Sequence, residues 1–161
     1  MNWARRNDRE VAGLENILTI LDKCDIMRLG LSVDNKPYIV PMNFAYELED
    51  ENIRIYFHCA SEGRKMDMIA QNNNVCFETD CSYKMLKGET ACGCSAEFES
   101  VIGEGNITVL TDGTKKIDAL DMLMKRYGFT GKPYYKPHEL LAVTILQISV
   151  TSITGKHKTK K

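Results

Sequence analysis

An apolar strand that runs into a polar turn and two adjacent cations constrains this chain more than any other feature. Residues 56–60 are mostly apolar, a turn-like stretch follows at 61–63, and Arg64 and Lys65 open a helical pattern. Backbone N–H groups at a helix N-terminus and a neighbouring Arg-Lys pair can share the charge of one phosphate. The largely apolar segment 38–46 can supply a flat wall beside it. We therefore expect a phosphorylated, planar cofactor.

Length and composition narrow the class of protein. The 161 residues fit one domain over 1–161, which is long enough to bury roughly two-thirds of the surface of the unfolded chain. A formal net charge of -1 argues against a general attraction to nucleic acid or membranes. The first residues contain no apolar run, so we expect neither a secretory signal nor a membrane span, and a cytoplasmic location.

The cysteines do not predict a metal site. In a cytoplasmic protein, four of them are expected to be reduced, largely packed thiols: Cys24, Cys59, Cys76 and Cys81. Cys92 and Cys94 are separated by one residue, which is shorter than the usual zinc-ligand spacing, and no second Cys/His pair follows nearby. No metal is therefore expected.

The first half of the chain predicts a helix followed by an antiparallel meander. Asn7 and Glu10 form a capping-box pattern, and apolar residues then recur at helical spacing, which predicts a helix over about 8–22. Alternating segments separated by turn residues predict three strands, at 26–33, 38–46 and 53–58.

The second half continues with two helices and three strands. Helices are expected at about 62–71 and from residue 114 to about 127. Strands are expected at 75–80, 96–110 and 141–150, a loop at 84–90, and a mobile basic tail at 157–161. Gly103 and Gly105 predict a bulge or bend that curls the sheet into a barrel. These elements describe a mainly β protein with flanking helices.

The order of elements and several motifs resemble the FMN-binding split-barrel superfamily that includes pyridoxamine 5′-phosphate oxidase. Four segments look most like its nitroimidazole-resistance branch: Val40–Tyr46, Tyr56–Asp67, Glu99–Gly105 and Ile153–Lys156. The resemblance covers roughly residues 8–156. It implies an antiparallel, six-stranded split β-barrel of Greek-key type.

The resemblance also implies an FMN site. By similarity, Pro41, Met42, Asn43 and Phe44 would lie along the flavin ring, whereas His58, Cys59, Arg64 and Lys65 would surround the ribityl phosphate. Where relatives of the oxidase type carry a serine, this chain has Gly63, so Ser61 or a backbone N–H must replace the missing hydroxyl. Ser100 would contact the flavin across a homodimer interface, and Lys156 could reach the phosphate.

His58 and Asn43 each have more than one interpretation. His58 could contact FMN, donate a proton during substrate reduction as the candidate catalytic residue, serve as an axial haem ligand, or simply pack at the strand end. Asn43 could bind the pyrimidine edge of the flavin or satisfy neighbouring backbone groups. The residues alone leave these alternatives open.

The activity that the resemblance implies is the reduction of small oxidised compounds, nitroaromatic-like ones among them, by a homodimer with FMN at its interface. NAD(P)H is the expected transient electron donor, although no GxGxxG motif is present. The Arg-rich carboxy-terminal motif of the oxidase has no counterpart, so oxidation of vitamin B6 is not expected. Two alternatives are a non-catalytic FMN or haem carrier or sensor, and a ligand-free dimeric barrel.

Overall fold

The structure is a computed structural model and describes residues 6–159. Its strands are β1 (Glu10–Val11), β2 (Ile26–Val33), β3 (Lys36–Asn43), β4 (Ala45–Glu49), β5 (Asn52–Ala60), β6 (Asn74–Leu86), β7 (Ser95–Val109) and β8 (Val143–Lys158). Its helices are α1 (Leu14–Lys23), α2 (Arg64–Gln71), α3 (Gly113–Arg126) and α4 (Pro137–Ala142), with 3-10 turns η1 (Asn7–Arg9) and η2 (Ala91–Gly93).

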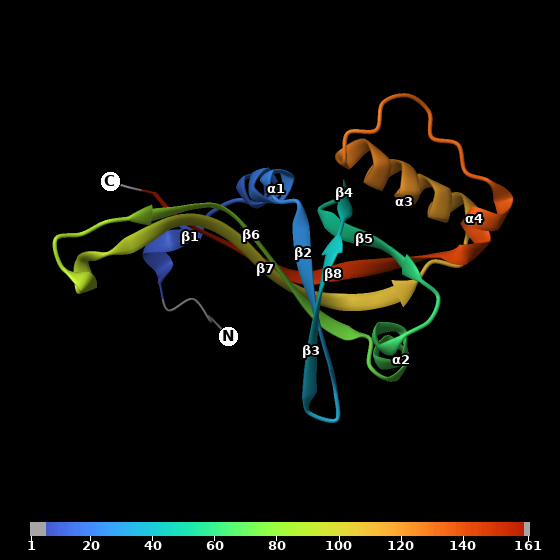
Figure 1. The fold of residues 1–161 in the computed structure, drawn as a ribbon, viewed down its shortest axis with the longest axis horizontal. Helices are drawn as coiled ribbons and strands as arrows, with labels where there is room; N and C mark the ends of the chain where they lie inside the picture. The colour runs from blue at the N-terminus through green and yellow to red at the C-terminus, as the bar shows by residue number, and fades with distance from the viewer. Residues whose placement is uncertain (1–5, 160–161) are drawn as a thin grey trace.

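The strands form one antiparallel sheet that bends almost into a closed barrel. Its order is β3-β2-β6-β7-β8-β5-β4, and β1 pairs with β8 outside this path. The two end strands, β3 and β4, are consecutive in the chain and are joined by Phe44. Figure 1 shows the β6–β7 hairpin projecting as a long arm and α3 with α4 beside β4 and β5. The mainly β, antiparallel split-barrel fold that the sequence predicts is confirmed.

The sheet has eight strands, whereas six were predicted. One predicted strand, 38–46, is broken at Phe44 into β3 and β4, because the chain there leaves one end of the sheet and enters the other. The second additional strand is β1, where Glu10 pairs with Lys156 and Val11 with Gly155. Both additional strands depend on pairing between distant parts of the chain, which a local sequence pattern does not predict.

The barrel interior holds the main hydrophobic core, and a smaller core lies under α3. Phe44, Phe57 and Phe77 are almost fully buried in the main core, which α1 and α2 help to cover. The smaller core combines strand and helix residues: Ala45, Tyr56, Ala119, Leu120, Leu123 and Ile145. Strand β5 contributes to both cores, because its successive side chains alternate between the two faces of the sheet.

The prediction of a helix from residue 8 is wrong at its start. Residues 7–9 form a 3-10 turn, β1 follows, and α1 begins only at Leu14. Gly13 precedes α1 with a φ of 85°, a left-handed conformation that suits glycine. Long-range pairing with β8 therefore overrides the local helical pattern.

Three further expectations also change. β6 continues to Leu86, past a register shift between Cys81 and Lys84. The loop predicted to begin at residue 84 therefore begins three residues later, after Leu86. Helix α4 occupies part of a predicted loop, and β8 begins at Val143. β8 then continues to Lys158, so a mobile tail from 157 is wrong at its first two residues, while residues 160–161 lie outside the described part of the chain.

The expected distortion of the long extended segment is confirmed. β7 and β8 shift register between Glu104 and Gly105, which is the β-bulge predicted for this stretch. Gly103 has a different role, because a Cβ there would come within 2.2 Å of the Phe77 ring and 2.7 Å of the Ser152 carbonyl oxygen. The absent side chain lets the sheet curve closely over Phe77.

Candidate functional site

The junction between β5 and α2 leaves the N-terminus of a helix without a side-chain cap. Gly63 occupies the N-cap position with φ 114° and ψ 169°, and no side chain accepts a hydrogen bond from the first helical turn. The N–H groups of Met66 and Asp67 bond to the Gly63 carbonyl. The partial positive charge of the remaining N–H groups is available to an anion.

Two cations stand beside this helix end without acidic partners. The Arg64 guanidinium lies over the Tyr38 ring at 4.4 Å from its centroid. The Lys65 ammonium is 3.7 Å from the sulfur of Met42. Within residues 6–159, neither cation forms an ion pair. Cations at a helix N-terminus oppose the helix dipole, so a bound anion would relieve an unfavourable arrangement.

Cys59 lies at the base of the same junction. Its sulfur is 3.9 Å from the sulfur of Met66, on the face of β5 that packs against the main core. Burial raises the pKa of the Cys59 thiol, and the neighbouring Lys65 ammonium partly opposes that shift. The thiol is therefore neutral at physiological pH and can donate only weakly to a ligand.

Strand β3 presents two of the four predicted ring-contact residues outward. Pro41 and Asn43 are exposed on the open face of the sheet, whereas Met42 and Phe44 are buried on the core side. Phe44 is packed under the Arg126 guanidinium, 4.2 Å from its ring centroid. Because β3 pairs only with β2, its second edge lies open toward the β5–α2 junction. The side chains of Pro41 and Asn43 thus lie on the opposite face of β3 from Met42, whose sulfur Lys65 contacts, so a flat ligand at the junction would meet the open edge of β3.

His58 lies on the opposite face of β5 from Cys59. Its cross-strand partner, Ile145, belongs to the smaller core under α3, whereas Cys59 packs against the main core. The His58 side chain is exposed. Within one chain the structure therefore separates His58 from Cys59 and Lys65, although they are close in sequence. Ser61 is exposed in the turn that follows β5.

Ser100 and Lys156 are brought together, but away from the helix junction. They are cross-strand partners on β7 and β8, with Asp80 of β6 opposite Ser100 on its other side. Figure 1 shows this part of β7 and β8 toward the arm and β1, whereas α2 lies on the other side of the molecule. In one chain, these two predicted contacts and the Arg64–Lys65 pair form separate groups.

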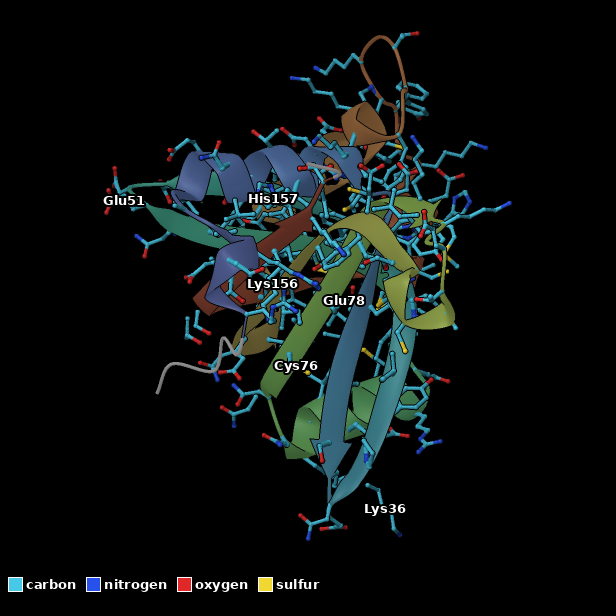
Figure 2. All side chains as sticks on the ribbon, turned by 90° about the vertical axis from the view of Figure 1, so that its left-hand side faces the viewer. Lys36, Glu51, Cys76, Glu78, Lys156 and His157 are labelled. Atoms are coloured by element: carbon cyan, nitrogen blue, oxygen red, sulfur yellow. The ribbon has the colours of Figure 1, made fainter. Side chains whose placement is uncertain are left out.

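The open face of the sheet carries a charged cluster that sequence reasoning missed. Arg28 of β2 bonds Glu78 at 2.9 Å and Asp80 at 2.6 Å, both on β6. Figure 2 shows Cys76 and Glu78 along β6, with Lys156 of β8 in the same view. Alternating polar residues in 26–33 and 75–80 were the available signal, but only the strand pairing shows that they meet.

The same open face is also apolar and hollowed. Three isoleucines are substantially exposed on it: Ile26 at 38%, Ile39 at 66% and Ile102 at 51%. A groove of about 510 Å³ includes one of them, Ile39, and is lined also by Gly30, Cys76 and Asn106. Gly30 keeps the groove open, since a Cβ at this position would lie 2.6 Å from the Cys76 sulfur.

Among the described residues, neither a metal site nor a membrane-spanning helix is found. Across residues 6–159, no three His, Cys, Asp or Glu side chains are grouped so that they could hold a metal ion. In the same part of the chain, no helix combines the length and the apolar character needed to cross a membrane. Cys92 and Cys94 are exposed free thiols in the turn of the β6–β7 arm.

Comparison with known proteins gives consistent matches over most of the chain. The sequence profile of a family described as pyridoxamine 5′-phosphate oxidase matches residues 14–157. No curated protein matches the chain in sequence. Among solved structures, a candidate 5-nitroimidazole antibiotic resistance protein from Bacteroides thetaiotaomicron is 30% identical with a TM-score of 0.79, the match covering 92% of this chain and 86% of that one.

Two more distant structures share the fold. The flavocytochrome Anf3 from Azotobacter vinelandii has a TM-score of 0.81 at 19% identity, with 98% of this chain and 72% of that one covered. An FAD- and haem-binding protein from Mycobacterium smegmatis has a TM-score of 0.82 at 17% identity, covering 94% and 74%. At these identities, the likeness concerns the fold alone.

Proposed function

Since the chain belongs to the pyridoxamine 5′-phosphate oxidase family, we propose that it is an FMN-binding oxidoreductase that reduces small oxidised compounds with electrons from NAD(P)H. The observation that carries this proposal is the uncapped N-terminus of α2, flanked by two cations without acidic partners. The similarity to a candidate 5-nitroimidazole resistance protein supports nitroaromatic-like compounds as substrates.

The residues at the junction fit the phosphate and one wall of FMN. Arg64, Lys65 and the first N–H groups of α2 would hold the phosphate by charge and hydrogen bonds. Gly63 leaves that helix end unobstructed, since nothing lies within 4 Å of a Cβ built at this position. The open edge of β3 at Pro41 and Asn43 would border the planar ring, and the Asn43 amide can bond both donors and acceptors of its pyrimidine edge.

The bound cofactor would supply the redox chemistry, while the protein supplies binding, orientation and electrostatics. Because the sequence contains no GxGxxG motif, NAD(P)H is expected to bind transiently at the open cofactor face.

A homodimer is part of this proposal. The open sheet face exposes three isoleucines, and large apolar patches on such a face are typical of interfaces. A second copy seated there would bring Ser100 and Lys156 of one chain toward the cofactor of the other. Light scattering should give twice the chain mass, and Ile102→Lys should produce monomers that lose FMN. Leu141→Lys, at an apolar position of α4 that is 84% exposed and lies off this face, is the matched control.

A carrier of FMN or haem is the alternative function, and the exposed His58 is the feature that keeps haem in consideration. Two distant structural relatives share this fold: one is a flavocytochrome, and the other is described as an FAD- and haem-binding protein. Access and reduction distinguish the alternatives, because an enzyme needs rapid reduction of its cofactor by a nicotinamide, whereas a carrier does not.

Absorbance between about 300 and 700 nm tests the proposal directly. The freshly purified protein is titrated with FMN and then with NADPH under anaerobic conditions. Flavin bands that bleach with NADPH, and recover when a nitroaromatic is added, support the reductase. Bound flavin that stays oxidised supports the carrier. A Soret band that disappears in the variant His58→Ala would identify His58 as the haem iron ligand. A colourless protein whose spectrum does not change when FMN is added would contradict cofactor binding.

A further inference from the structure

We propose that a pocket between the two ends of the chain is a second anion site, which binds a phosphate-bearing small molecule. This terminal pocket has a volume of about 410 Å³ and is lined by Arg6, Asp8, Arg9, Leu86, His157, Lys158 and Thr159. It is separate from the helix junction, since it contains no residue of β3, β5 or α2. The inference does not depend on FMN binding.

The fold assembles this pocket from segments that are more than 140 residues apart in the sequence. Pairing of Glu10 with Lys156 holds the N-terminal segment against the last strand. On the other side of β8, His157 pairs with Glu99 and Lys158 with Phe98 of β7. Figure 2 shows Lys156 and His157 beside the N-terminal segment. The strand predicted to be a mobile basic tail is thus fixed next to two N-terminal arginines.

The charges of the pocket are not balanced. Arg6 is engaged with Asp8 through two hydrogen bonds of 2.8 Å, which lower the pKa of that carboxyl group to about 2. Arg9 lies over the Phe98 ring at 5.9 Å and forms no ion pair within residues 6–159. The Lys158 ammonium donates to the uncharged hydroxyl of Ser95 and forms no ion pair within the described residues. Three permanent cations therefore face a single carboxylate.

Phosphate is the anion that best matches these donors. A guanidinium presents paired N–H donors to phosphate oxygens, and an ammonium adds a point charge. The volume is in the range of small-molecule sites, and Leu86 gives the pocket apolar surface against which a base or ribose can pack. Because Glu10 follows Arg9 directly and Glu99 flanks Phe98, a long polyanion would meet carboxylates as soon as it left the pocket.

Calorimetric titration of the full chain tests this assignment. The probes are inorganic pyrophosphate, ADP, adenosine and a twelve-nucleotide single strand of thymidines. We expect pyrophosphate and ADP to bind one per chain, and adenosine not to bind. Tighter binding of ADP than of pyrophosphate indicates a nucleotide as the natural ligand, whereas equal binding indicates a free phosphate or diphosphate. Both results support the site.

Substitutions then locate the binding. Arg9→Gln and Lys158→Gln should each lower the affinity for ADP and for pyrophosphate about tenfold, because each removes one charge-assisted contact. Lys36→Gln, at the distant tip of the β2–β3 hairpin, is the matched charge control and should leave both affinities unchanged.

Three results would overturn the proposal. The first is binding that Arg9→Gln and Lys158→Gln do not alter. The second is an equal loss in Lys36→Gln, which would show a general charge effect. The third is an oligonucleotide that binds more tightly than ADP and loses affinity in the same variants, which would show a nucleic-acid surface.

Discussion

The hydroxyl oxygen of Tyr127 lies 3.0 Å from the amide nitrogen of Phe44 and 2.6 Å from the carbonyl oxygen of Asp25. It accepts a hydrogen bond from the first and donates one to the second. Phe44 is fully buried at the point where β3 passes into β4. One phenol at the end of α3 therefore satisfies a buried backbone group at the place where the barrel closes without strand pairing.

Removing this hydroxyl should destabilise the fold. Tyr127→Phe keeps the ring but leaves the buried Phe44 N–H without its acceptor, which costs about 1–3 kcal/mol. Tyr134→Phe is the control, because Tyr134 is 80% exposed. Urea denaturation should show a lower midpoint for the first variant only, with unchanged slopes. Equal stability of the two variants would mean that water replaces the hydroxyl.

Loss of either Arg64 or Lys65 should weaken the binding of FMN, and only through the contact with its phosphate. Arg64→Gln and Lys65→Gln should each raise the FMN dissociation constant about tenfold or more, because each removes a charge-assisted contact. Quenching of flavin fluorescence measures the affinity. Riboflavin, which lacks the phosphate, should bind the variants and the original chain equally. A parallel loss of riboflavin binding would instead indicate that the variants disturb the fold.

Glycine should be required at the N-cap of α2 but not at the start of α3. Gly63 has φ 114° and ψ 169°, a region that side-chain-bearing residues reach only at a cost of about 1–3 kcal/mol. Gly63→Ala should lower the free energy of unfolding by about that amount. Gly113 has no positive φ and open space around its Cα, so Gly113→Ala should stabilise the chain by roughly 0.4–1 kcal/mol. Thermal and urea unfolding of both variants provide the comparison.

The ion pair between Lys23 and Glu99 should contribute to stability above the acidic range. The two Lys23–Glu99 contacts measure 2.8 and 2.9 Å, and hydrogen bonds from Lys23 and then Ser82 lower the pKa of Glu99. A carboxyl group with a lowered pKa in the folded state stabilises it above the unfolded pKa, and this contribution disappears as the pH falls through the folded pKa.

Lys23→Gln should therefore be less stable than the original chain near pH 7. The difference should shrink as the pH falls below the ordinary glutamate pKa of 4.5 and through the lowered pKa of folded Glu99. Urea midpoints measured at half-unit steps of pH give this curve. Lys36→Gln should show no such convergence, and a pH-independent difference in Lys23→Gln would assign the effect to packing.

Local sequence patterns were sufficient where an element depends on its own residues. The cationic start of α2 at Arg64, the amphipathic α3 and the hairpins β2–β3 and β4–β5 follow from turn chemistry and periodicity, whereas the continuous three-stranded meander predicted there is wrong, because β3 and β4 lie at opposite ends of the sheet. Elements that depend on distant partners were not predictable in this way. Glu10 and Val11 become a strand only because β8 passes beside them, and β8 continues to Lys158 only because β7 does.

The candidate site shows the same division. Strand alternation was enough to place His58 and Phe57 on opposite faces, and the structure shows that Cys59 accordingly faces away from His58. The pairing of Arg28 with Glu78 and Asp80, and the gathering of both chain ends around one pocket, required the order of the strands. Nothing in the local sequence specifies that order.

The closure of the barrel at Phe44 has a mechanical consequence. Elsewhere along the path from β3 to β4, neighbouring strands can separate only by breaking a ladder of hydrogen bonds. At Phe44 the two ends of the sheet are tied by the chain itself, and burial of the Phe44 ring and the bond from its N–H to Tyr127 hold that tie against the end of α3. A shift of α3 would therefore move the two ends of the sheet relative to each other while every ladder stays intact.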